Sequence, residues 1–490
     1  MKKILLISIL KNSHRNLSCL ALFSFLRSKN FDVNLLFLPK EKEYQEKIVG
    51  RFLKSKKFSI VGISVMTDNF YFAGRLTKNI KKFLPHAHII WGGIHPTLEA
   101  KECLGYADSV CIGEGEISFL SLINNIFHNE NYSLLSGVGT KAFDKRVIIN
   151  PPPPLINNLD LLPPIRYDWH RFYIQDARGF RHFDAKEYER YSNYNGEDYT
   201  IMTSRGCPFS CTYCCNSFIN ELYHTRGRIR RQSVNHVIKE IKLAKRTMNN
   251  IKFINFNDDQ FLTERKWINE FCRKYKKEVN LPFIVRLCPG TFDGNDVKKL
   301  NSAGMLFATV GIQSGSERTN RDIFKRRFDK NTIIEASRIL SKNGVHPFYD
   351  IIINNDLEND SDRRKTIELL LELQKPFAFN FFALTPFPKT QLAQIYKKKG
   401  IKPQTNPYGK KSYSDYDEKD FYFQLAYIIG FTSNNICRYF LNHSKDKCVR
   451  RVLNAYYKEV KDTKNKITKS QQTVQSNPRS HLNIKKSDNE

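Results

Sequence analysis

Four cysteines lie within nine residues of each other, in the stretch SRGCPFSCTYCCN. Cys207, Cys211 and Cys214 have CxxxCxxC spacing and follow a predicted strand. Three thiolates on one tight loop can hold three irons of a cubane iron–sulfur cluster and leave the fourth iron without a protein ligand. A structural zinc site would need a fourth Cys or His at matching spacing, and Cys215 cannot easily turn inward beside Cys214. The spacing therefore favours a 4Fe–4S cluster with one open iron.

The number of cysteines and the clustering of four of them indicate a reducing compartment. The chain has 11 cysteines, an odd number, and their clustering is not the pattern of a disulfide framework. The start, MKKILLISIL, is like a signal peptide, but it lacks a small-residue cleavage site and continues into the polar KNSHRN. No apolar stretch reaches the ~18 residues that a membrane span needs. We therefore expect a cytoplasmic protein without a transmembrane segment.

Six apolar runs of strand length in the second half of the chain alternate with helical stretches. Strands are expected at 198–206, 251–257, 282–288, 306–313, 345–353 and 377–384, and helices at 233–247, 264–278, 293–303, 331–343 and 361–373. Six βα units in about 200 residues are too few for a closed eight-stranded barrel. The pattern predicts an open, partial (βα)6 barrel of the TIM type, with the cysteine loop after its first strand.

Residues 1–135 show the same alternation. Strands are expected at 4–10, 33–38, 59–65, 88–93 and 109–113, and a helix at 17–29. Continuous apolar strands separated by helices indicate a parallel sheet covered on both faces, so we expect a Rossmann-like α/β domain. Ser64, Gly92 and Gly93 lie at the carboxyl ends of two strands, where open α/β sheets bind ligands. The pattern GxGxxG is missing after the first strand, which argues against a dinucleotide site.

Prolines and composition set the remaining domain boundaries. The stretches PPPP and LLPPIRYDW cannot continue a helix or a central strand, so residues 136–195 are expected to form a Pro-rich linker. The core that carries the cysteines then spans 196–400. Residues 401–490 lose the βα rhythm and are expected to be mainly helical, with a polar tail from about 463 that lacks fixed structure.

The cysteine loop resembles the cluster loop of radical S-adenosylmethionine (radical SAM) enzymes, and the similarity extends over roughly 196–395. In that family the aromatic residue before the third cysteine, here Tyr213, lies beside the nucleotide. The resemblance implies that Asp258 and Asp259 hold the amino group of S-adenosylmethionine, and that Gln313 and Ser314 reach its ribose or methionine part. From the residues alone, the two aspartates could instead cap the next helix, and Gln313 and Ser314 could be ordinary turn residues.

The same resemblance implies a reaction type. In the family S-adenosylmethionine chelates the open iron, and its reductive cleavage yields a 5′-deoxyadenosyl radical. The expected cofactors are thus a 4Fe–4S cluster on the three cysteines and S-adenosylmethionine, with an electron donor such as flavodoxin or ferredoxin. The resemblance assigns no particular catalytic residue. The loop after the fifth barrel strand reads NNDLEND and departs from the usual Pro and Glu.

The amino-terminal domain resembles the cobalamin-binding domain that is fused to some of these enzymes. The resemblance rests on the stretches GISVMT, WGGIHPTLEA and ADSVCIGEGE. It implies that Ser64, Gly92 and Gly93 line a slot for the nucleotide tail of cobalamin, where larger side chains would clash. The family's DxHxxG stretch, whose histidine binds cobalt, reads NSHRNL here. Because Asn12 replaces the carboxylate that orients such an imidazole, we expect that His14 is not the cobalt ligand.

Together the two resemblances imply a cobalamin-dependent radical SAM enzyme that methylates an unactivated carbon of a small-molecule, lipid or natural-product substrate. Relatives with both domains also close or rearrange rings without methyl transfer. A tRNA-modifying methylthiotransferase would need a second cysteine-bound cluster, for which the amino-terminal domain offers Cys19, Cys103 and Cys111. A non-catalytic cobalamin or iron–sulfur sensor is the remaining alternative.

The charge of the chain is large but diffuse. The 79 Lys and Arg residues exceed the 49 Asp and Glu residues by 30. The excess is spread along the sequence and is not gathered into one basic arm, which is weak support for a nucleic-acid partner. We therefore do not expect nucleic acid as the substrate.

Overall fold

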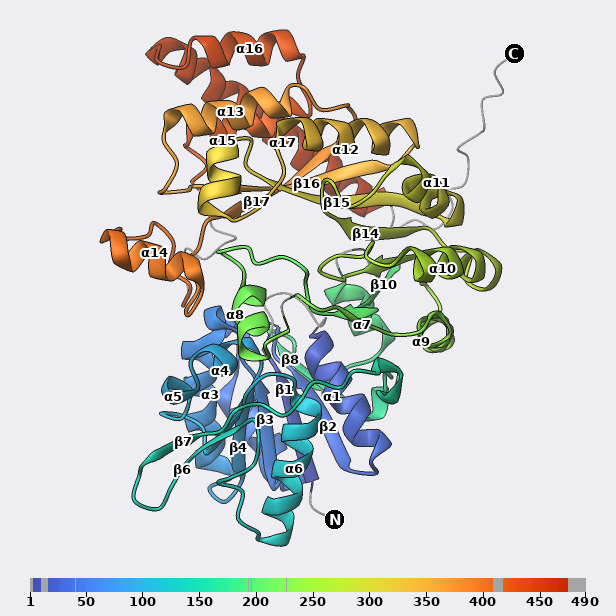
Figure 1. The fold of residues 1–490 in the computed structure, drawn as a ribbon. Helices are drawn as coiled ribbons and strands as arrows, with labels where there is room; N and C mark the ends of the chain where they lie inside the picture. The colour runs from blue at the N-terminus through green and yellow to red at the C-terminus, as the bar shows by residue number, and fades with distance from the viewer. Residues whose placement is uncertain are drawn as a thin grey trace.

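Two sheets lie one above the other, with helix α8 (Cys215–Leu222) between them (Figure 1). The computed structural model describes residues 3–9, 16–39, 41–192, 194, 196–225, 227–408 and 417–474, and the side chains of the last helix as far as residue 465. The first sheet belongs to the amino-terminal part of the chain and the second to the part that carries the cysteine loop.

The first sheet has nine strands in the order β7-β6-β5-β4-β3-β1-β2-β8-β9. Strands β1 to β5 and β8 run parallel, and β6, β7 and β9 are antiparallel additions at the two edges. The parallel strands of the first domain are β1 (Lys3–Ser8), β2 (Asp32–Phe37), β3 (Ile60–Ser64), β4 (His88–Gly92) and β5 (Ser109–Cys111). All five were predicted from the sequence, within two residues at most ends.

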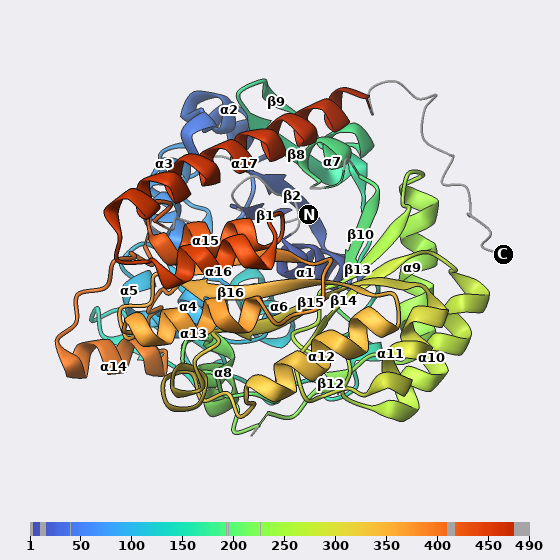
Figure 2. The same ribbon diagram turned by 90° about the horizontal axis from the view of Figure 1, so that it is seen from above.

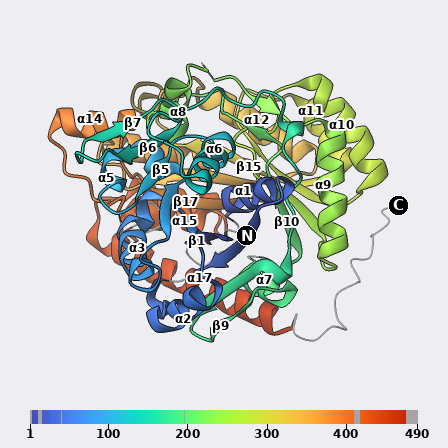
Figure 3. The ribbon, with the colours of Figure 1, turned by 90° about the horizontal axis from the view of Figure 1, so that it is seen from below.

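Helices cover both faces of this sheet. Helices α1 (Leu17–Ser28) and α6 (Gly115–His128) lie on one face and share a hydrophobic core with it (Figure 3). Helices α2 (Glu46–Lys56), α3 (Phe70–Phe83) and α5 (Ala100–Cys103) pack on the other face, and the short α4 (Ile94–Leu98) follows β4. The strands are therefore buried on both sides, which explains their continuous apolar sequences. This arrangement confirms the predicted Rossmann-like domain.

Residues 136–195 differ from the linker that the prolines suggested. They add β6 (Val138–Lys141), β7 (Val147–Ile149), β8 (Phe172–Asp176) and β9 (Gly179–His182) to the first sheet, and they form helix α7 (Ala185–Tyr191). The stretches around the prolines are irregular. Short β-branched and aromatic runs pair with the sheet on either side of them, a signal that the proline count concealed.

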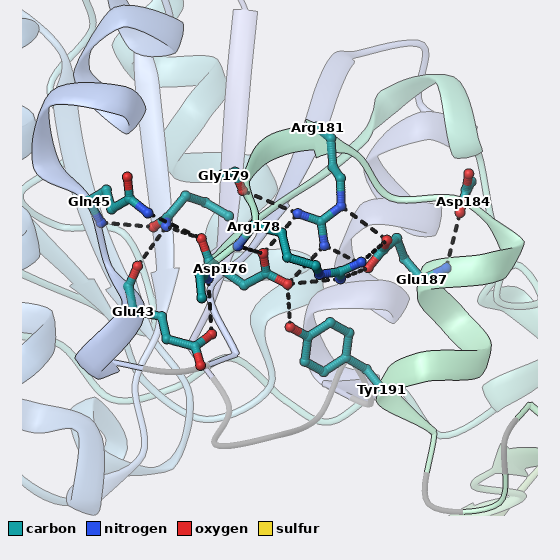
Figure 4. A network of polar contacts seen from close by, with 11 residues as sticks. Glu43, Gln45, Asp176, Arg178, Gly179, Arg181, Asp184, Glu187 and Tyr191 are labelled. Atoms are coloured by element: carbon teal, nitrogen blue, oxygen red, sulfur yellow. Dashed lines mark hydrogen bonds and ion pairs between the residues drawn. The ribbon is translucent and has the colours of Figure 1, made fainter. Parts of the chain in front are cut away.

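An ion-pair network holds the β8–β9 hairpin to α7 (Figure 4). Arg181 donates from both terminal nitrogens to the carboxylate of Asp176, each over 2.8 Å, and from Nε to Glu187 over 3.0 Å. Arg178 also donates to both carboxylates, and Tyr191 donates to Asp176 over 2.5 Å. Since Asp176 and Glu187 are buried, the network fixes this segment to the first domain.

The second sheet has six parallel strands in sequence order, β10-β13-β14-β15-β16-β17. The strands are β10 (Asp198–Ile201), β13 (Phe253–Phe256), β14 (Phe283–Leu287), β15 (Met305–Gln313), β16 (His346–Ile353) and β17 (Ala378–Ala383). A small ladder of β11 (Ser204–Arg205) and β12 (Arg230–Arg231) stands beside it. Helices α9 (Val234–Thr247), α10 (Arg265–Glu278), α11 (Gly294–Ala303), α12 (Lys330–Lys342) and α13 (Asp360–Leu370) follow the strands. The sheet is the predicted partial (βα)6 barrel.

The carboxyl-terminal region is helical, as expected. It comprises α14 (Gln391–Lys399), α15 (Phe421–Ile429), α16 (Asn434–Asn442) and α17 (Lys447–Val474). Helix α15 packs on α13, and α16 and α17 pack on α15 (Figure 2). The aromatic stretch 421–431 packs onto the barrel, because the rings of Phe381 and Phe423 are 5.1 Å apart. Helix α17 continues through Val474, past the point near 463 where we expected regular structure to end.

Candidate active site

The cysteine loop is fixed to the barrel through Thr212, which is fully buried. Its hydroxyl donates to the carbonyl of Ile323 over 2.6 Å, and its N–H donates to that of Phe324 over 3.2 Å. Its own carbonyl accepts from the N–H of Leu392 at the start of α14 over 2.8 Å. Since Thr212 stands between Cys211 and Tyr213, these bonds hold the middle of the CxxxCxxC loop against the end of the π-helical turn Thr319–Ile323 and the start of α14.

The thiols of Cys207, Cys211 and Cys214 lie close enough to influence one another electrostatically. Burial raises the pKa of Cys207 to about 12, and a hydrogen bond with Cys215, together with burial, raises the pKa of Cys214. Binding of iron must therefore displace protons from these sulfurs. Among the described residues no three Cys, His, Asp or Glu side chains converge as a ready metal-ligand group. The donor set, three thiols on a fixed loop, nevertheless suits a cubane cluster.

Asp258 and Asp259 point in different directions. Asp258 is fully buried and accepts from the hydroxyls of Thr203, over 2.9 Å, and Ser204, so it holds the strand end before the cysteine loop. Asp259 is exposed, accepts from Nδ2 of Asn216 over 3.0 Å and lies near the thiols of the loop. Neither aspartate caps α10, whose N-cap residue is Glu264. The geometry therefore favours Asp259 over Asp258 as a cofactor contact.

Arg286 stands at the end of β14, and its charge influences Asp259 and also Asp350 on β16. Asp350 accepts from Nδ2 of Asn380 over 2.9 Å. A cation on β14 thus lies near acidic groups at the end of β13 and on β16. These residues give the barrel interior a polar side next to the cysteine loop.

The end of β15 is irregular at Gln313, and Ser314 follows it. Gln313 has a φ of 70° and is buried, and the register against β16 shifts between Gly311 and Gln313. The hydroxyl of Ser314 donates to Oε1 of Glu358 over 2.7 Å. Glu358 belongs to the NNDLEND loop that departs from the family's pattern. Ser314 therefore tethers this loop to β15, and its hydroxyl is already engaged.

Tyr213 packs edge-on against Phe324, with ring centroids 4.9 Å apart. Its hydroxyl accepts a hydrogen bond from Nη1 of Arg326 over 3.2 Å. The ring is therefore held beside the cysteine loop, on the side where β15 ends.

A cavity of about 400 Å³ lies between the two domains, within the ~300–1,000 Å³ that is usual for small-ligand sites. The first domain lines it with Leu6, Phe25, Ser64, Gly92, Gly93 and Phe119, and the second with Met202, Gly206, Asn216, Ile219, Asn220 and Tyr223. All three residues that the sequence assigned to cobalamin thus line one cavity. His14, in contrast, lies outside the described residues.

Glycines create the space at the edge of the first sheet. A Cβ on Gly62 would lie 2.9 Å from Leu6 and 3.0 Å from Phe119. Gly93 has a φ of +103°, and a Cβ there would lie 3.1 Å from the carbonyl oxygen of Val65. At Gly92 the nearest atom to such a Cβ is 3.8 Å away, so that position opens into the cavity. A mostly apolar slot of this kind, widened by glycines, fits the tail of cobalamin.

Ion pairs join the two domains beside this cavity. Arg205, two residues before Cys207, donates to Glu114 over 2.8 Å and to Glu116 over 2.6 Å. Arg230 also donates to Glu114, and to the carbonyl of Ile156 over 2.7 Å. The GEGE loop of the first domain is thereby tied to the strand that leads into the cysteine loop.

Family models match both halves of this arrangement. The model of the radical SAM superfamily matches residues 201–370, and that of the B12-binding domain matches residues 3–123. Fold and site together define a radical SAM enzyme with a cobalamin-binding domain. The chain thus carries a radical SAM domain and a B12-binding domain. Its cofactors are those of the two domains: a 4Fe–4S cluster, S-adenosylmethionine and cobalamin.

Known proteins similar to the chain include methyltransferases. An uncharacterized methyltransferase of Pyrococcus horikoshii is 28% identical over 349 residues, which cover 70% of each chain. Cytidylyl-2-hydroxyethylphosphonate methyltransferase of Streptomyces wedmorensis is 25% identical over 71% of this chain and 68% of its own length. The radical SAM methyltransferase TsrM of Kitasatospora setae has the same fold, with a TM-score of 0.66 and 15% identity over 81% of this chain and 75% of its own. Among the described residues no helix is long and apolar enough to cross a membrane.

Several residues of the site carried no clear signal in the sequence. The contact of Arg205 with Glu114 and Glu116 joins two segments that are distant in the sequence. The only sequence signal for it is that each segment lies at the carboxyl end of a strand. Arg326 stands in the charged run FKRRF, where nothing separates a buried arginine from solvated ones. Nothing in the sequence distinguishes Thr212, which stands inside the cysteine loop, as the residue that fixes the loop to the barrel.

Proposed function

We propose that this enzyme methylates an unactivated carbon of a small molecule. The observation that carries the proposal is the position of the cavity between the domains: Asn216 lines it and also donates a hydrogen bond to Asp259 beside the cysteine loop. When bound, the cluster with S-adenosylmethionine supplies a 5′-deoxyadenosyl radical, and cobalamin supplies a methyl group. The residues between the two sites have to hold the substrate within reach of both.

We assign the following roles within this proposal. Cys207, Cys211 and Cys214 bind the cluster, and Asp259, Tyr213 and Gln313 contact S-adenosylmethionine. Asp258 and Ser314 were also expected there, and we now assign them to the support of the loops that carry these contacts. Ser64, Gly92 and Gly93 accommodate the tail of cobalamin, and the cobalt has no ligand from His14.

The partners follow from the same chemistry. A low-potential one-electron donor such as flavodoxin or ferredoxin reduces the cluster, and the substrate is a small molecule, a lipid or a natural product. We place the enzyme in the cytoplasm, because a cluster-binding group of free thiols suits a reducing compartment.

The rival functions fit the structure less well. A methylthiotransferase needs a second cluster, but Cys19 and Cys111 are buried in one hydrophobic core of the first domain and Cys103 in the other. Burial raises the pKa of Cys19 and Cys111 to about 12, as expected of packed thiols. A sensor would not need a cavity between the two domains that reaches Asn216, the hydrogen-bond partner of Asp259 beside the cysteine loop.

Two products of S-adenosylmethionine test the proposal without knowledge of the substrate. Protein with cluster and cobalamin, incubated with S-adenosylmethionine and dithionite under anaerobic conditions, should form both 5′-deoxyadenosine and S-adenosylhomocysteine. Omission of cobalamin should abolish S-adenosylhomocysteine alone. Formation of 5′-deoxyadenosine without S-adenosylhomocysteine in the complete mixture would contradict methyl transfer, and the absence of both products would contradict an enzymatic role.

A further inference from the structure

Arg326 is a buried arginine that contacts two sulfurs. It is 8% exposed and follows the π-helical turn Thr319–Ile323. Nη1 donates to Sγ of Cys211 over 3.5 Å, and Nη2 donates to Sγ of Cys288 over 3.3 Å. Nη2 also donates to the carbonyl of Gly311 over 2.7 Å. One guanidinium therefore links a cysteine of the cluster loop to the ends of β14 and β15.

The surroundings are shaped to hold this guanidinium. A Cβ on Gly311 would lie only 3.3 Å from Nη2, so the absence of a side chain there permits the close approach. The ring of Phe328 lies 4.7 Å from the guanidinium carbon. The N–H of Arg326 donates to the carbonyl of Asn320 over 2.7 Å. The position of the charge is thus fixed by backbone carbonyls, by the ring of Phe328 and by the hydroxyl of Tyr213.

No carboxylate of the described residues forms an ion pair with Arg326. The charge of Arg326 acts to lower the pKa of Asp350, but the carboxylate of Asp350 is hydrogen-bonded to Asn380. A buried charge is costly unless an opposite charge compensates it. Cys211 is deprotonated when it binds iron, and its sulfur then becomes the anionic partner that Arg326 otherwise lacks.

We propose that Arg326 raises the reduction potential of the cluster by donating an N–H···S hydrogen bond to Cys211. The inference rests on the proposed assignment of Cys211 as a cluster ligand. Hydrogen bonds to cluster sulfurs and the net charge around them set the potentials of iron–sulfur proteins. An added electron makes the cluster more negative, so a fixed cation beside it stabilises the reduced form. The electron comes from an external one-electron donor, and no bond of Arg326 is made or broken.

Arg326→Met tests the proposal, since it keeps an unbranched side chain but removes both charge and donors. The cluster of the variant, titrated without S-adenosylmethionine, should be harder to reduce: at a fixed solution potential the ratio of reduced to oxidised cluster should fall at least tenfold, which corresponds to about 59 mV for one electron. Arg326→Lys keeps a cationic donor and should recover part of the loss. An unchanged potential in Arg326→Met, at full iron and sulfide content, would overturn the proposal.

Two control variants separate the contact from general effects. Cys288→Ala removes the other sulfur but leaves the bond to Cys211, so the potential should stay at the wild-type value. Arg286→Met removes a cation of the barrel that makes no sulfur contact, and it should change the ratio by less than the Arg326→Met substitution. An equal shift in Arg286→Met would mean that net charge, and not the hydrogen bond, is responsible, and would also overturn the proposal.

A measurement on the unmodified protein covers the case in which the variants lose the cluster. Wild-type protein made with 15N-labelled arginine should show a 15N coupling in the pulsed electron paramagnetic resonance spectrum of the reduced cluster. Absence of the coupling would refute the hydrogen bond. Absence of any cluster in wild-type protein would instead refute the proposed function, so the two failures are distinguishable.

Discussion

Arg205 Nη2 lies 2.6 Å from Glu116 Oε1, and this ion pair crosses the boundary between the two domains. Both side chains are largely shielded from water: 24% of the Arg205 side chain and 7% of the Glu116 side chain are exposed. Burial by itself would raise the pKa of Glu116, but the charge and hydrogen bond of Arg205 outweigh it, and the pKa is lowered. The pair therefore links the loop that borders the cavity between the domains to the strand that leads to Cys207.

We predict that Arg205→Gln weakens cobalamin binding about tenfold, the equivalent of ~1.4 kcal/mol. The substitution leaves the buried carboxylate of Glu116 without its strongest partner, and the loop that borders the cavity is no longer fixed. Equilibrium binding of cobalamin, followed by absorbance, measures the change. Formation of 5′-deoxyadenosine in the absence of cobalamin should persist.

Arg75→Gln is the matched control for this prediction. It breaks the Arg75–Glu41 pair of 2.9 Å, whose side chains are about half exposed, and exposed pairs contribute little. Cobalamin affinity should not change in the control. Equal affinity of wild type and Arg205→Gln would show that the domain contact does not support the cavity.

Single replacements of Cys207, Cys211 and Cys214 by Ala should each abolish stable binding of the 4Fe–4S cluster, because two thiolates leave two irons without protein ligands. Iron and sulfide analysis after anaerobic reconstitution measures the loss. Cys215→Ala should retain the cluster, and so should Cys272→Ala on α10. If Cys215→Ala lost the cluster while Cys214→Ala kept it, the third ligand would have to be reassigned to Cys215.

Gly92→Val should reduce cobalamin binding at least tenfold without loss of folded protein. The position has no atom closer than 3.8 Å to an added Cβ, so the side chain fits the folded chain but occupies the slot. Gly294→Ala, where an added Cβ meets nothing within 4 Å, serves as control and should bind cobalamin normally. Thermal unfolding shows whether each variant is folded; a folded Gly92→Val with wild-type affinity would place the tail of cobalamin elsewhere.

The sequence predicted the two sheets well because their signal is local. Each parallel strand is an apolar run between helical segments, and burial on both faces makes that run continuous. The strands β6 to β9 escaped prediction because they are short, and because β6 and β8 join the sheet through strands distant in the sequence. For example, Leu36 in β2 pairs with Tyr173 in β8. Neither segment contains a local sequence pattern that predicts this pairing.

Residues of the candidate site could be predicted from the sequence only where their spacing or their type leaves few alternatives. The cysteines and the glycines belong to this class, since few other residues could replace them. Asp258 and Asp259 are adjacent and chemically identical, yet one is buried against Thr203 and the other faces the cysteine loop. Which of the two turns inward depends on the exact end of β13. Contacts between domains, such as Arg205 with Glu116, depend on tertiary structure and left no local pattern.

The buried carboxyl group of Glu240 predicts a pH dependence of stability. Glu240 on α9 accepts from the N–H of Ile165 over 3.1 Å and from the hydroxyl of Tyr199 over 3.0 Å. Burial raises its pKa from 4.5 to about 7, and these two hydrogen bonds offset only part of the effect. Tyr167 and Tyr188 lie nearby and face the same buried region. The residue ties the irregular segment before β8 to the barrel.

The direction in which the pKa of Glu240 is shifted decides whether stability rises or falls with pH. Because the pKa is higher in the folded chain than in the unfolded chain, the folded chain binds the proton more tightly. The associated stability is complete below pH 4.5 and is lost as the pH rises through 7. Because the pKa rises from 4.5 to about 7, the loss is about 3 kcal/mol.

Glu240→Gln should therefore raise the free energy of unfolding at pH 8 by about 2–3 kcal/mol relative to wild type, and have little effect at pH 4. The amide can accept from Ile165 and donate to Tyr199, so the hydrogen bonds can be kept. Urea unfolding at several values between pH 4 and pH 8 measures the difference, with the exposed Glu278→Gln on α10 as control. A difference between Glu240→Gln and wild type that is the same at every pH would show that Glu240 does not gain a proton on folding.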